Sequence, residues 1–461
     1  MMKFIFVSGG VISGLGKGIT TASIALLLKS RGFKVAPVKA DMYLNIDAGT
    51  MNPLEHGEIF VTDDGTETDQ DLGHYERFLD QSLSRENYIT AGEIYQKVLN
   101  KERALEYDGK CVEAYIHIPE EIMKRYEQLG KKADIVIVEY GGTVGEYQNV
   151  MFFEAARRMK IKYKDDVLFV HVGYLPLPLS IGEMKTKPIQ QSIHELNELG
   201  IRPDIVVCRS EKPIDTRRKD KIALVAALDD EDIITNPDVL SIYEVPLLLE
   251  TQGLDKRILK KLKLKQKKKN LKDWNRLNQK IKAEKRLVKI GMVGKYYSSG
   301  GFSLEDSYVS VVEAIKHAAW ANNVDPKIVW YDSERIEEKG IEGLKGIDGM
   351  IVPQGWGSRG VEGKIRAVQF ARENKIPYLG LCFGMQMAVI EFGRNILGLK
   401  RANSTEINPK TSHPVIHIMP DQKEYLAKKQ YGGTIRLGGW KCRVLAKTRL
   451  ANVYGKPGVI S

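Results

Sequence analysis

The chain has 461 residues, of which 43% are hydrophobic and 28% charged, and its net charge is +11 at pH 7. This length allows two or three domains with cores of their own, and the composition is typical of a soluble globular protein. No apolar run approaches the roughly 20 residues that a membrane span needs, and the N-terminus shows no cleavable signal, so we expect a cytoplasmic protein without a membrane partner. The four cysteines lie far apart without a CxxC pair, which argues against a zinc site and a disulfide framework.

A glycine-rich loop follows the first predicted strand. Residues 4–7 form an apolar run typical of a buried strand, and residues 19–31 favour a helix. Between them lies GGVISGLGKG, residues 9–18. Such a loop presents backbone N–H groups and a helix N-terminus to a phosphate, and Lys17 would neutralise the β- and γ-phosphates. An ordinary tight turn is the alternative, but a turn does not need this many glycines and a lysine.

The loop departs from the strict P-loop pattern in two places. Five residues instead of four separate Gly10 from Gly16, and Gly18 stands where a Mg²⁺-binding Ser or Thr would follow the lysine. We therefore expect carboxylates from elsewhere in the chain to hold the metal of an ATP site.

Apolar runs alternate with helical patterns over residues 1–250, which is typical of a parallel sheet covered by helices on both faces. The runs that indicate short buried strands are residues 34–39, 134–139, 167–172 and 204–208, with a helix expected around 190–199.

Ligands of such sheets gather at the carboxyl ends of the strands. Glu139 ends one predicted strand, and Asp71 lies in the acidic stretch 62–78. These two carboxylates are our candidates for the missing Mg²⁺ ligands. We interpret Asp63, Asp64 and Glu67 of the same stretch as parts of a solvated acidic loop.

Five segments of this region together resemble the synthase domain of the CTP synthase family. They are GGVISGLGKG (9–18), KADMYLNIDAGTM (39–51), HGEIFVTDDGTETDQDLGHYERF (56–78), VEYGGTVGE (138–146) and GEMKTKPIQ (182–190). The resemblance is collinear over about 250 residues. It implies that ATP phosphorylates O4 of the UTP base and that ammonia then displaces the phosphate to give CTP.

The resemblance also implies site residues. Lys17 and Lys39 would stabilise the transferring phosphoryl group, and Asp71 and Glu139 would hold Mg²⁺. The implied ATP-binding residues are Gly14, Leu15, Gly16, Lys17, Gly18, Ile19, Asp71, Asp238 and Val239. The implied UTP- and CTP-binding residues are Ser13, Glu146, Tyr147, Gln148, Lys185, Thr186, Lys187, Pro188, Ile189, Gln190 and Lys221. The family's CTP-inhibition segment usually has Asp at position 146 and Glu at position 148, so this chain departs from it in the residues that set feedback strength.

Residues 251–287 form a lysine-rich, glycine-poor stretch, which we interpret as a linker between two domains. Eight lysines crowd it: Lys260, Lys261, Lys263, Lys265, Lys267, Lys268, Lys269 and Lys272. A basic run can bind nucleic acid, but few aromatic side chains are interleaved here for base stacking. We therefore favour a solvated linker helix and expect no nucleic-acid partner.

The α/β pattern resumes in a second domain, residues 288–461, with predicted strands at 327–330, 349–352 and 377–381. Cys382 lies between the last of these strands and a predicted helix, in GLCFGMQ, which is typical of a nucleophile elbow. We expect the helix N-terminus to lower the pKa of the Cys382 thiol. A buried structural cysteine is the alternative, but the flanking glycines favour a nucleophile. Gly355 could supply an N–H group to an oxyanion hole.

This second domain resembles a class I glutamine amidotransferase, the ammonia-producing half of the same family. The resemblance implies that Cys382 attacks the amide of glutamine. The implied glutamine-binding residues are Gly355, Phe383, Gly384, Met385, Gln386 and Glu406. Gln354 stands where the family usually has glycine. The resemblance further implies GTP as an allosteric activator and a homotetramer whose subunits share sites.

The histidine and glutamate of the family's catalytic triad belong to a region beyond Ser461. After Cys382 only His413 and His417 remain, in a stretch that resembles an ordinary family strand. A thiolate without a base cannot easily release ammonia, so we expect these residues to make CTP from ammonium and to hydrolyse little glutamine.

Two other functions stay open. One is a non-catalytic regulatory or assembly-forming homologue of CTP synthase, which the intact Lys17, Lys39, Asp71 and Glu139 disfavour. The other is a ParA-like or carboxylate-activating ATPase with a nucleic-acid-binding linker, which the KTKPIQ segment and the second domain disfavour.

Overall fold

The computed structural model describes residues 2–178, 180, 182–295, 298–299, 302–303, 305–428, 433, 436–455 and 458–460. The chain divides into two compact units. Unit 1 comprises Met1–Ala48, Phe60–Asn278 and Leu437–Ser461, and unit 2 comprises Gly49–Ile59 and Gln279–Arg436. Within the described ranges, no helix is both long enough and apolar enough to span a bilayer.

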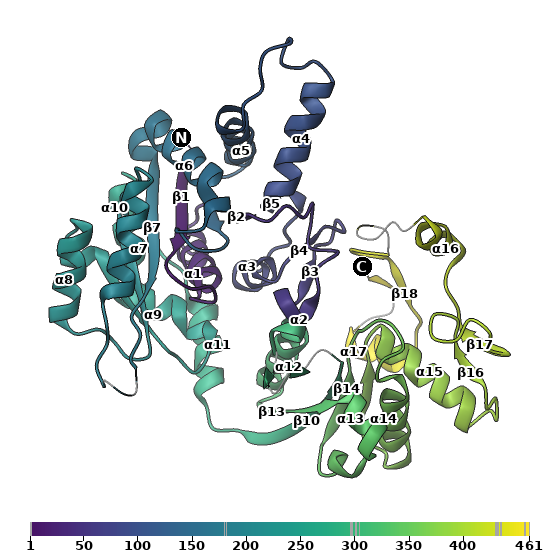
Figure 1. Cartoon of the computed structure of the whole chain (residues 1–461). Helices are drawn as coiled ribbons and strands as arrows, with labels where there is room; N and C mark the ends of the chain where they lie inside the picture. The colour runs from purple at the N-terminus through teal and green to yellow at the C-terminus, as the bar shows by residue number, and fades with distance from the viewer. Residues whose placement is uncertain are drawn as a thin grey trace. The chain divides into compact units, whose positions relative to one another are not determined.

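A seven-stranded parallel sheet forms the centre of unit 1 (Figure 1). Its strands in spatial order are β5 (Tyr88–Thr90), β2 (Val35–Asp41), β6 (Ile135–Tyr140), β1 (Lys3–Gly9), β7 (Val167–Tyr174), β8 (Ile205–Ser210) and β9 (Ile233–Pro237). All five apolar runs predicted as strands belong to it, so the parallel α/β fold is confirmed. The sequence pattern missed β5, which has three residues, and β9, which ends in polar Asn236 and Pro237.

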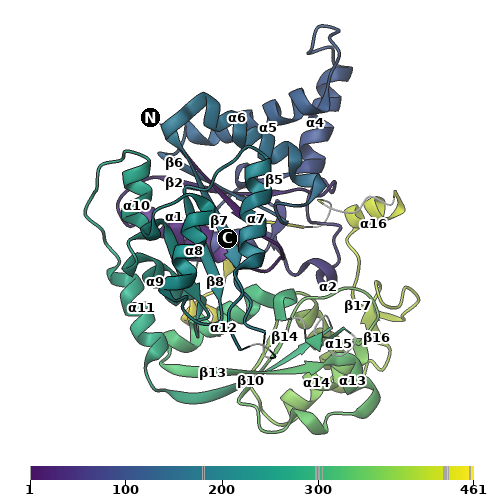
Figure 2. The same ribbon diagram turned by 60° about the vertical axis from the view of Figure 1, so that its left-hand side comes forward.

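Both faces of this sheet are covered, which is why its strands are apolar throughout (Figures 1 and 2). On β1, Phe4 and Phe6 enter one core cluster, while Ile5 and Val7 enter the other. The helices that cover the two faces are α5 (Ala114–Gly130) and α6 (Val150–Tyr163) on the first, and α1 (Lys17–Lys29), α9 (Val245–Thr251) and α10 (Leu254–Lys261) on the second.

Four further helices complete the surroundings of the sheet. They are α3 (Asp71–Leu79), which packs on α1, α4 (Ala91–Arg103), which packs on α5, and α7 (Lys187–Glu198) and α8 (Thr216–Ala226), which pack on each other. Ile189 of α7 and Ile222 of α8 share a core cluster with Val206 of β8. The short strands β3 (Ile59–Val61) and β4 (Glu67–Asp69) pair just before α3.

The lysine-rich stretch folds against unit 1. It contains α10 and α11 (Lys272–Lys282), and five of its apolar residues are buried in the same core cluster as α1: Leu254, Ile258, Leu259, Leu262 and Leu271. Asp255 is buried against Arg31, whereas most of the lysines lie on the outside. Within residues 256–272, all of which the structure describes, the ammonium groups of five exposed lysines make no hydrogen bond or ion pair: Lys256, Lys260, Lys265, Lys268 and Lys272. The stretch is therefore solvated on one side only.

Unit 2 contains a four-stranded parallel sheet in the order β13 (Val324–Asp332), β10 (Arg286–Gly294), β14 (Gly349–Val352) and β15 (Tyr378–Gly380). The helix α12 (Val309–Ala321) shares a core cluster with Met292, and α13 (Ser333–Lys339) and α14 (Val361–Glu373) share another with Val293. The remaining elements of unit 2 include α2 (Pro53–His56), β11 (Ser298–Ser299), β12 (Phe302–Ser303), α15 (Phe383–Asn395), β16 (Ala402–Ser404), β17 (His413–Ile416) and α16 (Pro420–Ala427). The last segment of unit 1 carries β18 (Cys442–Val444), α17 (Arg449–Val453) and β19 (Gly458–Ile460).

Candidate active site

The glycine loop links β1 to α1 through backbone conformations that need glycine. Gly16 caps α1 with φ 79° and Gly14 has φ 72°, both in the left-handed region. At Gly9 there is no room for a side chain, because an ideal Cβ would lie 2.5 Å from Cδ of Lys17. The lysine therefore lies along the loop backbone, and its Nζ donates a hydrogen bond to the carbonyl oxygen of Gly142, 2.8 Å away.

Gly18 occupies the position at which a Mg²⁺-binding hydroxyl was expected. An ideal Cβ at this position would overlap the carboxylate of Asp71, with Cγ only 2.7 Å away. Asp71 is the first residue of α3, and this carboxylate reaches back to the start of α1. The chain has therefore placed a carboxylate where other phosphate loops place a hydroxyl.

Lys39 lies at the centre of a buried cluster of acids at the carboxyl ends of β2 and β6. Its Nζ pairs with Asp71 and lies 3.3 Å from Oε1 of Glu139, its neighbour across the parallel strands. Asp41 and Asp69 each have an oxygen 3.8 Å from the same nitrogen. The sequence-predicted residues Lys39, Asp71 and Glu139 are thus brought together.

The protonation of this cluster follows from burial and charge. Burial works against the ammonium form of Lys39, but the four surrounding carboxylates outweigh it and raise the pKa of Lys39 well above its usual value. Burial also opposes ionisation of Asp71, yet Lys39 holds the pKa of that carboxyl below its usual range. Burial and the charge of Asp71 raise the pKa of Glu139 to about 7. Tyr75 of α3 donates a hydrogen bond to the second oxygen of Glu139.

The donor set of the cluster fits a magnesium ion held mainly by a nucleotide. Among the described residues, no three His, Cys, Asp or Glu side chains are arranged as a protein cage for a metal. Mg²⁺ commonly takes one or two carboxylates and completes its shell with water and phosphate oxygens, and Asp71 and Glu139 are such a pair.

The residues expected at adenine lie beside the phosphate loop. Asp238 follows β9 and pairs with Arg209 at 2.8 Å. The guanidinium of Arg209 is also close to the loop, because its Nε is 3.6 Å from the ideal Cβ position of Gly16. Val239 is partly exposed next to Asp238. Arg209 ends an apolar strand, and this position was the only sequence signal for it.

The residues expected at UTP form two groups. The first is the turn after β6, where Glu146 accepts hydrogen bonds from Thr143 N at 2.7 Å and from Gln148 Nε2 at 2.8 Å. This turn also contains Gly142, which binds Lys17, while Tyr147 is almost fully exposed. Ser13 lies exposed in the glycine loop.

The second group surrounds the N-terminus of α7. Thr186 is the N-cap, Lys187 and Pro188 begin the helix, and Gln190 bonds back to the Thr186 hydroxyl at 2.8 Å. Ile189 points into the core and anchors this turn.

Three basic residues outside that helix lie just before it or on α8, which packs on α7. Lys185 pairs with Glu183, and Arg218 of α8 donates to the Met184 carbonyl at 2.9 Å, a contact that sequence reasoning missed. The ammonium group of Lys221 is exposed on α8 and makes no hydrogen bond or ion pair with the described residues.

The acidic loop was only partly predicted, because Asp63 and Asp64 are exposed whereas Glu67 is buried in β4.

Cys382 in unit 2 has the backbone geometry of a nucleophile elbow. Its φ is 51°, a left-handed value that is unusual for a residue with a side chain, and it caps the N-terminus of α15. The flanking glycines are required, because an added Cβ at Gly380 would lie 2.6 Å from Met385 N and one at Gly384 would overlap the Val352 carbonyl. Cys382 is exposed as a residue, but the expected lowering of its thiol pKa is wrong: desolvation of the thiol, together with Glu406, raises the pKa and outweighs the Phe383 N–H group and Lys364.

Two buried lysines hold the loop expected to form the oxyanion hole. Lys295 donates to the carbonyls of Trp356 at 2.6 Å and Gly357 at 2.7 Å, and Lys364 donates to that of Pro353 at 3.1 Å. Both ammonium groups also lie over the ring of Phe383. Burial lowers the pKa of Lys295 to about 8, and burial together with Lys295 lowers that of Lys364 to about 7.

Of the expected glutamine ligands, Glu406 bonds to this loop, since Gly357 N donates to its Oε1 at 2.9 Å. Met385 is half exposed on α15, and the backbone N–H of Gln386 donates to the Cys382 carbonyl at 3.2 Å. His413 bonds to Ser412 and His417 to the Ile418 carbonyl, and neither histidine bonds to Cys382 or Glu406. The structure thus gives neither histidine the position of a base for the thiol.

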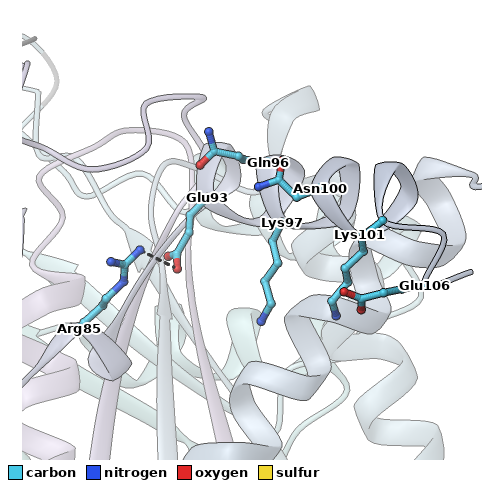
Figure 3. A pocket seen from close by; sticks show the side chains of 8 residues that line it. Arg85, Glu93, Gln96, Lys97, Asn100, Lys101 and Glu106 are labelled. Atoms are coloured by element: carbon cyan, nitrogen blue, oxygen red, sulfur yellow. Dashed lines mark hydrogen bonds and ion pairs between the residues drawn. The ribbon is translucent and has the colours of Figure 1, made fainter.

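A cavity of about 500 Å³ lies along α4, away from the predicted residues (Figure 3). It is lined by Arg85, Glu93, Gln96, Lys97, Asn100, Lys101, Ala104 and Glu106. Lys97 and Lys101 both pair with the buried Glu121 of α5. The charged side chains of this cavity thus already serve to hold α4 against α5.

The comparisons with known proteins agree with this geometry. The family model described as CTP synthase N-terminus matches residues 3–264, and the model described as glutamine amidotransferase class-I matches residues 303–445. A CTP synthase of Pyrococcus furiosus is 49% identical to this chain, with 99% of this chain and 84% of the relative covered. A CTP synthase of Methanocaldococcus jannaschii is also 49% identical, with 100% and 85% covered.

The fold and the sites define a two-part α/β protein of the amidotransferase class, in which one part has a glycine loop beside a cluster of acids around Lys39 and the other carries a cysteine elbow. The two relatives match nearly the whole of this chain. The chain belongs to the CTP synthase family.

Proposed function

We propose that the cluster around Lys39 is the place where this chain transfers a phosphoryl group from ATP to O4 of UTP. As a member of its family the chain is a glutamine-hydrolysing carbon–nitrogen ligase of pyrimidine biosynthesis, which uses ATP and UTP to make CTP. The observation that carries the site assignment is the convergence of Lys39, Asp71 and Glu139 beside the glycine loop.

In this proposal Lys17 and Lys39 supply the positive charge of the phosphoryl transfer. Such transfer depends mainly on positioning and on neutralising the charge of the phosphate oxygens. Lys17 lies along the loop, and Lys39 stays protonated because carboxylates surround it. ATP phosphates would bind at Gly14–Ile19, with adenine between Arg209 and the Asp238–Val239 backbone.

Asp71 and Glu139 would hold Mg²⁺ together with the phosphate oxygens of the nucleotide. The bound ion would offset the negative charge of the transferring group. The overlap of Asp71 with the Cβ position of Gly18 supports this assignment, because it places a hard oxygen donor at the start of α1.

UTP and the feedback inhibitor CTP would bind between the glycine loop and the N-terminus of α7. A helix N-terminus favours anions, and Lys185, Lys187 and Lys221 add positive charge for a triphosphate. We assign the base of CTP to the turn at Glu146–Gln148 and its triphosphate to Ser13 and the segment Lys185–Gln190.

Unit 2 would supply ammonia when a base is available to Cys382. Gly355 and Phe383 would donate N–H groups to the oxyanion, and Gly384, Met385, Gln386 and Glu406 would hold glutamine. Because burial raises the pKa of Cys382 and neither histidine contacts it, we propose that these 461 residues alone use ammonium well and glutamine poorly.

Three further features are proposals from the family. GTP would activate the glutamine half, four copies would assemble into a homotetramer that shares nucleotide sites, and the protein would work in the cytoplasm. The five unpaired lysines around α10 remain a solvated surface in this proposal, without a nucleic-acid partner.

One assay tests the proposal: CTP formation from UTP, ATP and Mg²⁺, with ammonium and separately with glutamine. We expect turnover with ammonium and little with glutamine. No turnover with ammonium, although UTP and ATP bind, would favour a non-catalytic homologue. Equal rates with both nitrogen sources would show that a base for Cys382 exists in these residues.

A further inference from the structure

A chain of buried hydrogen bonds runs beneath the glycine loop from β1 to α7. The Ser8 hydroxyl lies 3.0 Å from Nδ1 of His171, and Nε2 of His171 lies 2.8 Å from the Ser192 hydroxyl. Ser192 in turn donates to the Ile189 carbonyl at 3.0 Å. At most 5% of any of the three side chains is exposed. These hydrogen bonds thus connect β1, which leads into the glycine loop, to the neighbouring strand β7 and to α7, which begins at Lys187.

The hydrogens of this chain can be assigned in only one consistent direction. Ser192 has one hydroxyl hydrogen, which goes to the Ile189 carbonyl, so Nε2–H of His171 must donate to Ser192. Nδ1 is then an acceptor for the Ser8 hydroxyl. Burial and the nearby Lys17 lower the pKa of His171 to about 3, which agrees with a neutral ring.

The same helix also touches the glycine loop directly. An ideal Cβ on Gly10 would lie 2.7 Å from Oγ of Ser192, so only glycine fits there. One turn earlier, Ile189 packs against Gly173 of β7 so closely that an added Cβ would overlap its side chain. Two glycines and one histidine therefore set how far α7 lies from the loop.

An apolar side chain at residue 171 would be the simpler way to fill this space. The neighbouring residues of β7, Val170 and Val172, are apolar, and a polar network in a core stabilises it only when every member is bonded. A fully bonded network fixes one arrangement, because any shift of α7 would leave the Nε2–H group of His171 without an acceptor.

We propose that His171 is a positioning residue, which fixes the N-terminal turn of α7 at the distance from the glycine loop that UTP requires. This inference rests on the proposed assignment of Lys185–Gln190 to UTP. The strands β1 and β7 stay in place without these hydrogen bonds. Loss of the hydrogen bonds would therefore change UTP binding and leave ATP binding nearly unchanged.

Two variants of His171 separate the bond to Ser8 from the bond to Ser192. His171→Asn places an amide near the former Nδ1 and keeps the bond to Ser8, but does not reach Ser192. His171→Gln reaches the former Nε2 position and keeps the bond to Ser192. Ser192→Ala removes the last member, and Ser23→Ala, which deletes another buried hydroxyl of unit 1, is the control.

The measurement is calorimetric binding of UTP with Mg²⁺, and separately of a non-hydrolysable ATP analogue. His171→Asn and Ser192→Ala should weaken UTP binding at least about 10-fold, since a small misplacement of binding groups has effects of this size. His171→Gln and Ser23→Ala should stay within about threefold, as should analogue binding in all four variants. In the ammonium-dependent reaction, KM for UTP should rise in the variants that bind UTP more weakly, whereas KM for ATP should not.

Three results would overturn the inference: unchanged UTP binding in His171→Asn, equal weakening of both nucleotides, or equal loss in His171→Gln and His171→Asn. Lys187→Ala distinguishes this failure from a failure of the proposed UTP site. If Lys187→Ala weakens UTP binding while His171→Asn does not, only the inference fails. If Lys187→Ala leaves UTP binding unchanged, the site assignment fails and the inference fails with it. Should His171→Asn not fold, Ser192→Ala decides.

Discussion

The carboxylate of Asp71 fills the space that a side chain at position 18 would need. An ideal Cβ there would overlap Oδ1 and Cγ of Asp71, so no residue larger than glycine fits without displacing this carboxylate. The two helices α1 and α3 pack closely at this point. The glycine at position 18, which departs from the P-loop pattern, therefore makes room for the carboxylate of Asp71 in α3.

Gly18→Ser would place after Lys17 the hydroxyl that the P-loop pattern has there, but should lower ammonium-dependent CTP formation at least about 10²-fold, since it displaces Asp71 from its charge contact. The rate with saturating UTP and ATP measures this. Gly343→Ala, at a glycine with open space around it, controls for the general effect of replacing glycine. A rate within threefold of the unaltered chain in Gly18→Ser would show that Asp71 is not needed where it lies.

Lys17→Ala and Asp71→Asn should each lower ammonium-dependent CTP formation by about 10²–10⁴-fold, the scale of preorganised charge contacts. Lys34→Ala, an exposed lysine just before β2, is the control and should have no effect. Near-normal turnover in either site variant would remove that residue from the proposed mechanism.

Cys382 should react as a thiol with a raised pKa. Because burial and Glu406 disfavour the thiolate, its alkylation by iodoacetamide should keep accelerating from pH 7 to pH 9 without a plateau. Comparison with Cys382→Ala subtracts the exposed Cys111 and Cys442. A rate that is already maximal at pH 7 would contradict the raised pKa.

The stability of unit 1 should depend on pH through His171. An unfolded histidine titrates near 6.5, whereas His171 in the folded chain has a pKa of about 3, so only the unfolded state takes up the proton between these values. Its contribution to stability is complete above pH 6.5 and is lost as the pH falls towards 3, by up to about 1.4 kcal/mol per pH unit. Denaturant unfolding should show a shallower acid dependence in His171→Gln. Parallel curves for both proteins would contradict this prediction.

The five unpaired lysines around α10 should be dispensable for chemistry. Replacing Lys256, Lys260, Lys265, Lys268 and Lys272 with Gln should leave ammonium-dependent CTP formation intact and change stability by less than about 0.5 kcal/mol per site. Lys269→Gln is the contrasting variant, because Lys269 pairs with Glu250. Salt-dependent binding of duplex DNA that the fivefold variant loses would instead favour the nucleic-acid hypothesis.

The parts of the fold that follow from short stretches of sequence could be predicted. Apolar runs of four to six residues marked most of the longer strands of both sheets, because a strand buried on both faces has no polar side, but they missed the nine-residue β10. The three-residue β5 carries too little pattern for this. The interpretation of the lysine-rich stretch as a solvated linker rested on its charges, which dominate the composition. Its apolar residues Leu254, Ile258 and Leu259 hold it to the core.

The candidate site could be predicted only as residue types. Spacing in the sequence cannot show that Lys39 meets four carboxylates from three segments of chain, nor that Arg209 lies between the loop and Asp238. The pKa of Cys382 could not be predicted either, because a helix N-terminus lowers it and burial raises it. Which effect dominates depends on how much of the thiol is desolvated.

The uneven charge of the chain has a consequence for handling the protein. Ten of its 70 basic residues lie in residues 256–272, which contain no acid, so the rest of the chain holds 60 basic and 59 acidic residues. Away from this one surface the protein is close to electroneutral at pH 7, the condition in which molecules repel one another least. Its colloidal solubility and its retention on a cation exchanger would then depend on this short segment, and neutralising these lysines would bring the protein near its isoelectric point.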